Sequence, residues 1–346
     1  MTELRALTSV RGIAAWLVVL YHIRGGIAGL PAPAEALFAK GYLAVDFFFL
    51  LSGFVIWLTW HDRLRDPAAI PRFLHKRIAR IWPLHAVMLA FALALALLLR
   101  ATGRDDPAFP FAQLPLHLAL VQNWGLTDAL SWNDPAWSIS CELAAYLVFP
   151  LLVLAVDWRR LPTLPLLGIA AVLLLALHLA MRGAATLGAD IPRFGVIRCL
   201  AEFGVGTILA AIFLRRPPLL VVTIVMMAGG AAWMAGVAET LAAPATFAAA
   251  LLALSLTAGR PAHPLEGRAI HQLGEISYAT YLSHFLLWKA FKLPLAASAL
   301  SPIHVALYLA IVLAASVALY HGVERPAQRW LLRRPRSLRP APPARR

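Results

Sequence analysis

The stretch TSVRGIAAWLVVLYHIRGG, residues 8–26, is apolar and long enough to cross a membrane, yet it contains Arg11 and His22. At about 3.6 residues per turn these two residues lie almost three whole turns apart on one helix face, roughly 16 Å along the axis. An ionisable side chain inside a bilayer costs at least about 2.5 kcal/mol on insertion scales, so it is a functional hypothesis by default. The alternative is that Arg11 extends to the inner surface and His22 merely lies close to the outer one.

Apolar runs of similar length recur along the chain, which has 346 residues, 61% of them hydrophobic and 14% charged. A helix needs about 20 apolar residues to cross the roughly 30 Å hydrocarbon core of a bilayer, whereas a soluble core does not require such runs. The sequence therefore predicts an all-α, polytopic membrane protein with about ten transmembrane helices in one bundle. The predicted spans are residues 7–24, 43–60, 82–99, 137–156, 163–181, 197–214, 218–237, 241–258, 274–291 and 303–322.

The formal net charge is +14, and the basic residues lie mostly in alternate loops and in the tail RRPRSLRPAPPARR. This distribution suits orientation in a membrane and contact with anionic lipid headgroups better than binding of nucleic acid. Because loops rich in Lys and Arg remain in the cytoplasm, both termini are predicted to be cytoplasmic. The proline-bounded segment 110–126 would reverse this orientation if it spanned the membrane, so we expect it to be interfacial or re-entrant on the outer side.

Two parts of different composition make up the chain. Residues 1–325 are expected to form one membrane domain, whose first apolar run is retained as an anchor because no small-residue cleavage site follows it. Residues 326–346 form a basic tail rich in proline and arginine, expected to be disordered. Cys141 and Cys199 lie in apolar segments without metal-ligand spacing, so we expect neither a disulfide framework nor a metal site.

Three ionisable residues are expected at similar depth near the outer surface. His22 lies near the outer end of the first span, while Asp46 and Glu142 enter the second and fourth spans from the same side. A histidine with a carboxylate partner can hold one tautomer and accept a proton from an alcohol, so Arg11 and His22, with Asp46 or Glu142, form the predicted catalytic set. Interhelical hydrogen bonding or helix capping is the alternative role for both carboxylates. Ser138 precedes Glu142 by one helical turn and could orient it.

Basic residues gather where the third span begins, in RFLHKRIARIWPLH at residues 72–85. Lys76, Arg77 and Arg80 can converge on one helical surface, and guanidinium groups pair bidentately with phosphate oxygens. A cytosolic polyanionic donor would fit there, although positive-inside topology alone also explains basic residues at this position.

Polar residues also occur in two later spans. Ser277, Tyr281 and His284 follow at i, i+4 and i+7 in LGEISYATYLSHFLLWK, as a polar stripe that could contact substrate or link helices by hydrogen bonds. Arg198 and Glu202, at i and i+4, are predicted to form a structural ion pair within the membrane.

Six segments in order resemble the membrane acyltransferase-3 family, integral-membrane enzymes that O-acylate surface polysaccharides and related acceptors. The resemblance rests on LTSVRGIAAWLVVLYH, VDFFFLLSGFVI, RFLHKRIARIWP, PAWSISCELAAYLVFP, LGEISYATYLSH and GVERPAQRW. It implies a ten-helix core in a bacterial plasma membrane, a cytosolic acyl-CoA donor, usually acetyl-CoA, and transfer to a hydroxyl of a carbohydrate or glycolipid acceptor on the outer side.

The resemblance also implies roles for individual residues. Arg11 and His22 match residues that the family requires, Arg77 and Arg80 match a basic pair associated with the donor, and Trp137 joins the Trp-Ser-x-x-x-Glu block. Trp137, together with Ser138, Tyr281 and His284, is a candidate substrate contact, and Lys76, Arg77 and Arg80 are the candidate donor contacts.

The predicted mechanism places the phosphate end of acyl-CoA at the basic cluster, with its arm passing Arg11 along an open corridor toward His22. His22 would then deprotonate the acceptor hydroxyl or carry the acyl group itself, and the sequence leaves both routes open. A proton-coupled transporter or flippase is the alternative function, because it could need the same intramembrane charges. A non-catalytic membrane scaffold is a third reading, and the acceptor, acyl length and oligomeric state stay open.

Overall fold

The computed structural model describes residues 4–260, 263–295 and 300–333. Within them the chain is helical, and its only β feature is an isolated bridge between Ile27 and Leu300. This confirms the predicted all-α class, and ten helices coincide with the ten predicted spans. They are α1 (Arg5–Ile23), α3 (Ala44–Trp60), α4 (Ile70–Ala101), α6 (Ala136–Ala155), α7 (Thr163–Ala180), α8 (Ile191–Leu214), α9 (Leu219–Met234), α10 (Glu239–Thr257), α12 (Ser277–Lys292) and α13 (Pro302–Leu319).

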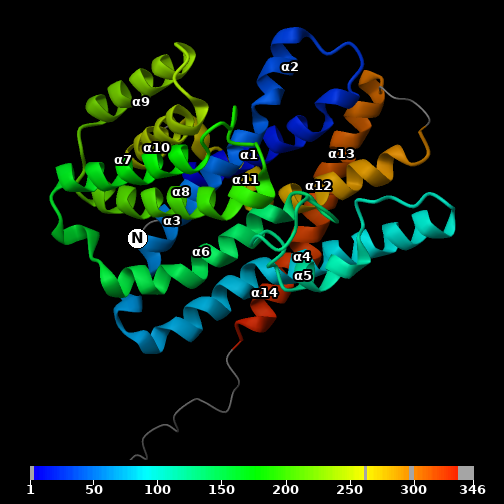
Figure 1. Cartoon of the computed structure of the whole chain (residues 1–346), viewed down its shortest axis with the longest axis horizontal. Helices are drawn as coiled ribbons and strands as arrows, with labels where there is room; N and C mark the ends of the chain where they lie inside the picture. Colours follow the sequence, from blue (N-terminus) through cyan, green and yellow to red (C-terminus); the bar gives the residue numbers. More distant parts are fainter. Residues whose placement is uncertain (1–3, 261–262, 296–299, 334–346) are drawn as a thin grey trace, which may run out of the picture.

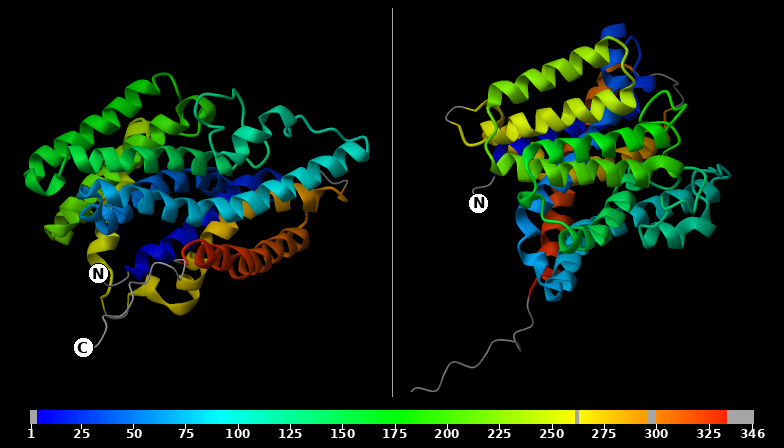
Figure 2. Two further views of the ribbon diagram at one scale, coloured as in Figure 1. Left: turned by 90° about the horizontal axis from the view of Figure 1, so that it is seen from below. Right: turned by 60° about the vertical axis from the view of Figure 1, so that its left-hand side comes forward.

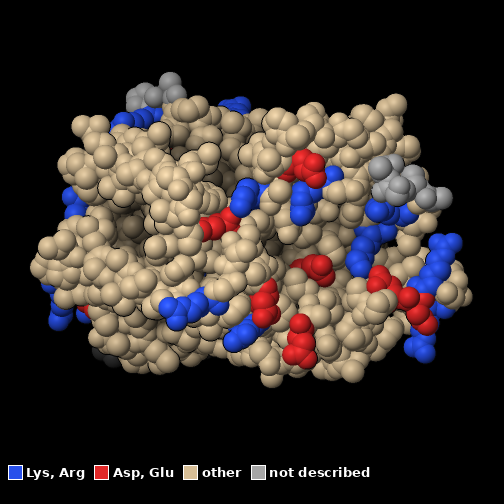
Figure 3. All heavy atoms as spheres, turned by 45° about the horizontal axis from the view of Figure 1, so that its top comes forward, with Lys and Arg blue, Asp and Glu red and all other residues tan. Residues whose placement is uncertain are grey.

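Length and apolar composition make this a multi-pass membrane protein. In the described part of the chain, eight helices are long and apolar enough to cross a membrane, whereas α9 and α12 have 16 residues each. The outer helices expose large apolar side chains, such as Leu164 at 79%, Leu220 at 72% and Ile303 at 80%. Such exposure would be unfavourable in water and is favourable against lipid tails. Figure 3 shows one face on which charged residues form only scattered groups.

The helices form one bundle around α1 and α3. Figure 1 shows α7, α8, α9 and α10 gathered on the left and α12 and α13 on the right, while the long helix α4 runs from the lower left to the right; Figure 2 shows the bundle from two further sides. The α3 and α8 backbones approach closely, and glycines at the contact allow this. A Cβ atom at Gly53 would clash with the carbonyl oxygen of Phe203, and one at Gly206 with that of Leu50. Small residues allow such close helix packing in membranes. The helix α11 (Arg268–Glu275) leads directly into α12 and packs against α1.

The segment 110–126 does not cross the membrane as a helix. It contains only a 3-10 turn and α5 (Leu114–Leu118), and five residues extend about 7.5 Å. The ring of His85 on α4 donates from Nε2 to the carbonyl oxygen of His117 over 2.7 Å, and His117 Nε2 lies 2.9 Å from the hydroxyl of Ser131. These contacts hold the segment against α4, as a re-entrant or interfacial piece requires.

The boundary predicted for the tail is wrong for its first residues. A π-helical turn (Tyr320–Glu324) follows α13, and α14 (Arg325–Leu331) then packs against α4. Glu324 pairs with Arg80 of α4, and this ion pair ties the segment to the bundle. Residues 334–346, the remainder of the predicted tail, lie outside the described residues. A second short helix, α2 (Ala32–Ala39), connects α1 and α3.

Candidate active site

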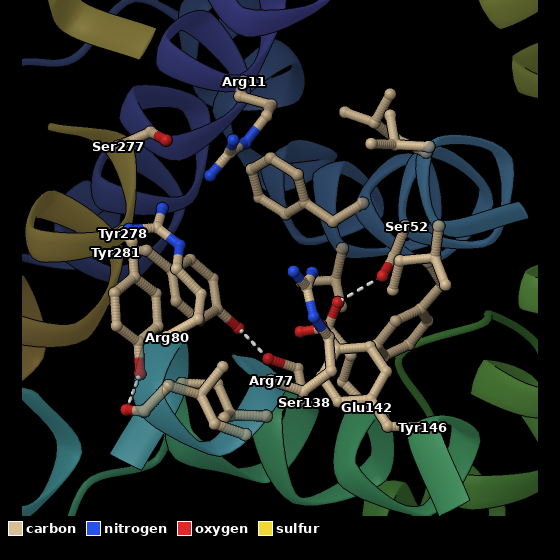
Figure 4. Close-up of a pocket in the computed structure, with 18 residues that line it drawn as sticks. Arg11, Ser52, Arg77, Arg80, Ser138, Glu142, Tyr146, Ser277, Tyr278 and Tyr281 are labelled. Atoms are coloured by element: carbon tan, nitrogen blue, oxygen red, sulfur yellow. Dashed lines mark hydrogen bonds between the residues drawn. The ribbon is translucent and has the colours of Figure 1, made fainter. Parts of the chain in front are cut away.

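A cavity of about 190 Å³ lies between α1, α3, α4, α6 and α12, the helices that carry most of the sequence-predicted site residues. Figure 4 shows polar side chains from all five helices around it. Its polar lining consists of Arg11, Ser52, Arg77, Arg80, Ser138, Glu142, Tyr146, Ser277, Tyr278 and Tyr281. The structure therefore brings Arg11, Arg77, Arg80, Ser138, Glu142 and Tyr281 together as one site.

The three predicted donor contacts differ in their surroundings. Arg80 is paired with Glu324, and its guanidinium carbon lies 5.4 Å from the centre of the Tyr278 ring. Arg77 lines the cavity, and its Nε atom is buried without a hydrogen-bond partner. Lys76 instead lies over the Trp60 ring, 5.2 Å from its centre, and is not among the residues that line the cavity. The predicted cluster therefore divides into Arg80 in an ion pair, Arg77 with no ion pair among the described residues, and Lys76 outside the cavity lining.

Arg11 adds a further cation to the cavity. In the part of the chain that the structure describes, it has no carboxylate within 4.0 Å, and it interacts electrostatically with Arg80, Glu142 and Glu324. A buried cation without a partner is costly, and a bound anion would remove that cost. The cavity can thus accept negative charge at Arg11 and Arg77.

Glu142 faces this cavity and not His22. The hydroxyl of Ser52 on α3 donates to Glu142 Oε1 over 2.5 Å, and Figure 4 shows the Arg77 guanidinium group directed toward the same carboxylate. The prediction that Glu142 aligns His22 is therefore wrong in this structure. Ser138, expected to orient Glu142, donates to or accepts from the hydroxyl of Tyr281 over 2.7 Å instead.

Asp46 is also not a partner of His22. Arg198 on α8 binds its carboxylate with two hydrogen bonds, 2.5 Å from Nε to Oδ1 and 2.6 Å from Nη2 to Oδ2. The predicted Arg198–Glu202 ion pair is wrong, since among the described residues Arg198 forms its ion pair with Asp46 and none with Glu202. The close packing of α3 against α8 explains why Arg198 pairs with Asp46 and not with Glu202. It allows a bidentate contact across the two helices, which Glu202, one turn along the same helix, cannot make.

Trp137 packs against the buried Asp46–Arg198 ion pair and does not line the cavity. The Arg198 guanidinium carbon lies 5.3 Å from the centre of the Trp137 ring, which also contacts Phe49 edge to face. Trp137 is 7% exposed and is absent from the cavity lining. Its predicted contact with substrate is not supported by this position, and its place beneath Arg198 indicates a structural role.

Tyr281 and Phe48 both line the cavity and contact each other. Their rings meet edge to face at 6.0 Å, and the Tyr281 hydroxyl also lies 3.1 Å from the carbonyl oxygen of Pro135. The Tyr281 ring also packs against the ring of His284, with the two ring centres 6.2 Å apart. His22 is not among the residues that line this cavity, so the cavity does not extend to His22 as the predicted open corridor would.

His22 and His284 form a pair next to Tyr281, whose ring contacts that of His284. Nε2 of His284 lies 3.2 Å from Nδ1 of His22, and the ring centres are 4.9 Å apart. His284 is fully buried, so the structure places it behind His22 and not at a substrate-accessible surface. The expected partner of His22 was a carboxylate, and the partner in the described residues is a second histidine.

A comparison with known proteins shows the family. A family model described as an acyltransferase domain, of the acyltransferase-3 type, matches residues 4–321. The chain belongs to this family. It is similar to acyltransferase MdmB of Streptomyces mycarofaciens, with 36% identity over 46% of this chain and 43% of that protein. It is also similar to protein 2 in the picA locus of Rhizobium radiobacter, with 32% identity over 41% of this chain and 78% of that protein. The match thus spans less than half of MdmB, and no solved structure matches the chain.

Several site residues of this family member escaped sequence reasoning. Ser52, Phe48 and Glu324 lie inside the segments VDFFFLLSGFVI and GVERPAQRW that carry the resemblance, but they received no role. Ser52 could have been singled out as a polar residue within an apolar span. Phe48 could not, because nothing in an apolar run distinguishes the ring that lines a cavity. Glu324 gave a signal as an acid beside a basic tail.

Charged residues lie above the histidine pair, at the end of the bundle predicted to face outward. Phe285 contacts His22 edge to face at 5.4 Å, and Lys289, one turn further along α12, binds Asp106 over 3.0 Å. Burial raises the pKa of Asp134 to about 6, with Lys289 lowering it and Asp106 raising it. An aromatic ring and a pair of opposite charges thus lie next to His22 along α12.

Proposed function

We propose that the chain is an integral-membrane O-acyltransferase that uses cytosolic acyl-CoA, with acetyl-CoA as the preferred donor. The acceptor is a hydroxyl of a carbohydrate or glycolipid at the outer side of a bacterial plasma membrane. The observation that carries the proposal is that Arg11, Arg77 and Arg80 line one cavity, within a chain of the acyltransferase family. Among the described residues, neither Arg11 nor Arg77 has a carboxylate oxygen within ion-pair distance. Guanidinium groups favour phosphate and other planar anions.

The cavity suits one part of a long donor. Its volume of about 190 Å³ is below the roughly 300–1,000 Å³ of pockets that enclose a whole drug-sized ligand. In the proposal, the phosphates of acyl-CoA bind at Arg77 and Arg80 toward the predicted cytosolic end. The acyl-bearing arm then follows the α6 face from Glu142 to Ser138 and ends at Tyr281. Because the contacts from the cavity to His22 run through Tyr281 and His284, the donor displaces the Tyr281 ring to reach His22 in this proposal.

His22 supplies the base in this proposal. The acceptor oxygen forms a bond to the thioester carbonyl carbon, its proton passes to His22, the carbon–sulfur bond breaks, and the CoA thiolate leaves and is protonated to the free thiol. Alternatively, Nε2 of His22 bonds to the thioester carbonyl carbon, the carbon–sulfur bond breaks and the CoA thiolate leaves. The acceptor oxygen then takes the acyl group from His22, and its proton passes to the CoA thiolate or to water. A burst of labelled enzyme before steady turnover, lost in His22→Ala, would favour the second route.

The test is the fate of labelled acyl-CoA. Purified protein in vesicles should release free CoA thiol and transfer radiolabelled acetyl to a carbohydrate or glycolipid extract, whereas empty vesicles should not. Glycans from cells with and without the gene, compared by mass, should differ by one or more acetyl groups. Release of no thiol with any acceptor, together with movement of an unmodified substrate across the vesicle membrane, would overturn the proposal in favour of a transporter.

A further inference from the structure

We infer that His284 is a positioning residue that fixes which ring nitrogen of His22 is free to take a proton. The inference rests on the proposed role of His22 as base and adds a second histidine to it. It follows from the hydrogen-bond partners of the two rings, which come from α1 and α12.

Both rings have one nitrogen beside a backbone carbonyl oxygen. Nδ1 of His22 lies 2.9 Å from the carbonyl oxygen of Val18, and Nδ1 of His284 lies 3.2 Å from that of Thr280. The remaining contact joins Nε2 of His284 to Nδ1 of His22 over 3.2 Å. In the described residues, neither ring has a carboxylate within ion-pair distance.

Carbonyl oxygens only accept hydrogen bonds, so they determine where the protons are. His284 must carry its proton on Nδ1 to bond Thr280, which leaves its Nε2 as an acceptor. His22 must carry its proton on Nδ1, where Val18 and His284 both accept it. With the proton on Nε2 of His22 instead, the lone pair of Nδ1 would face a carbonyl oxygen, and the two would repel.

This arrangement leaves Nε2 of His22 unprotonated and available as a base. When it takes a proton from an alcohol, the positive ring is stabilised through Nδ1–H by the lone pair of His284 and by the carbonyl oxygen of Val18. His284 thus fills the place that a buried carboxylate has in a serine hydrolase triad, without placing a second charge in the membrane. Tyr308 donates to the backbone carbonyl oxygen of His284 over 2.8 Å and fixes this turn of α12 against α13.

The proton positions can be measured directly on the unmodified chain. In protein labelled with ¹⁵N-histidine and reconstituted in lipid, protonated and unprotonated ring nitrogens resonate far apart, and difference spectra with His22→Gln and His284→Gln assign the two rings. We expect both rings to be neutral with the proton on Nδ1. A His22 ring protonated on Nε2 would overturn the inference.

Kinetics test whether His284 acts through His22. We expect His284→Leu to lower kcat by about 100-fold or more while the KM for acetyl-CoA stays within about twofold. His284→Gln should restore much of the rate, because its carboxamide oxygen can accept from Nδ1 of His22. His178→Leu is the matched control, since that histidine bonds Thr240 elsewhere in the bundle and should keep full activity.

The outcomes separate this inference from the proposed function. Wild-type turnover in a folded His284→Leu protein, together with an inactive His22→Ala protein, would overturn the role of His284 alone. Full activity in His22→Ala would overturn the proposed base. If His284→Leu does not fold, the ¹⁵N spectra and the Gln variant still decide the question.

Discussion

The arginine-lined cavity and the histidine pair lie one helical turn apart on α12 and solve opposite problems. The cavity presents Arg11 and Arg77, which have no ion pair among the described residues, whereas both nitrogens of His284 and Nδ1 of His22 have hydrogen-bond partners. Unpaired cations at a low-dielectric site attract an anion, while a proton acceptor works best when it starts uncharged and correctly oriented. The Tyr281 ring lines the cavity and also contacts His284, so it lies where the cavity and the histidine pair meet.

The largest effect is expected at the histidine pair. His22→Ala should lower kcat by about 10²–10⁴-fold, because it removes the group that accepts the proton, and should leave the affinity for acetyl-CoA unchanged. Turnover and donor binding would be measured on the same reconstituted preparation. Loss of donor affinity comparable to the loss of turnover would place His22 in the donor site and remove the contrast between the two regions.

A buried ion pair that faces no cavity should act on stability alone. Asp46→Asn leaves Arg198 unpaired inside the bundle and should cost about 3–5 kcal/mol of stability, seen as a lower midpoint of thermal unfolding in detergent. The double variant Asp46→Asn/Arg198→Leu should lose less than the sum of the two single changes. A folded Asp46→Asn protein with normal stability and no turnover would instead assign Asp46 to catalysis.

The cavity should respond in donor binding. Arg77→Ala should lower the affinity for acyl-CoA by about 10- to 100-fold, the equivalent of one charged hydrogen-bonding contact. The kcat at saturating donor should change little. Isothermal titration would measure the change, and the exposed Arg160→Ala is the matched control. Equal affinities in both variants would separate Arg77 from the donor.

The smallest effect on turnover is expected at Asp134, near Lys289 and Asp106, where a substitution should change the pH dependence of stability. Since its pKa is raised to about 6, the folded state binds more protons than the unfolded state between about pH 4 and 6, and stability falls as the pH rises through that window. Asp134→Asn removes this penalty, so the stability advantage of the variant over the wild type should grow to about 3 kcal/mol by pH 7. Unfolding midpoints at pH 4, 5, 6 and 7 would measure it, with the exposed Asp105→Asn as control. A difference independent of pH would contradict the raised pKa.

The outcome for each predicted residue follows from how far its partner lies along the chain. The motifs predict Arg11, Arg77 and Arg80 at one entrance of the bundle, and the structure places all three around one cavity. Glu142, predicted beside His22 near the opposite surface, lines that same cavity instead. The partners of these residues could not be assigned, because a span's pattern sets its depth but not the direction in which each side chain points. Asp46 was therefore paired with the wrong residue, and so was His22.

The sequence by itself determined the membrane class, the ten helices and the residues that bear charge in them, since apolar length and charge position are local properties governed by transfer into lipid. Only the tertiary structure decided that Asp46 binds Arg198, that Arg80 binds Glu324 and that His22 meets His284. The reason is steric. Which side chains meet depends on the rotation and close approach of whole helices, which glycines such as Gly53 and Gly206 allow and which no single span records.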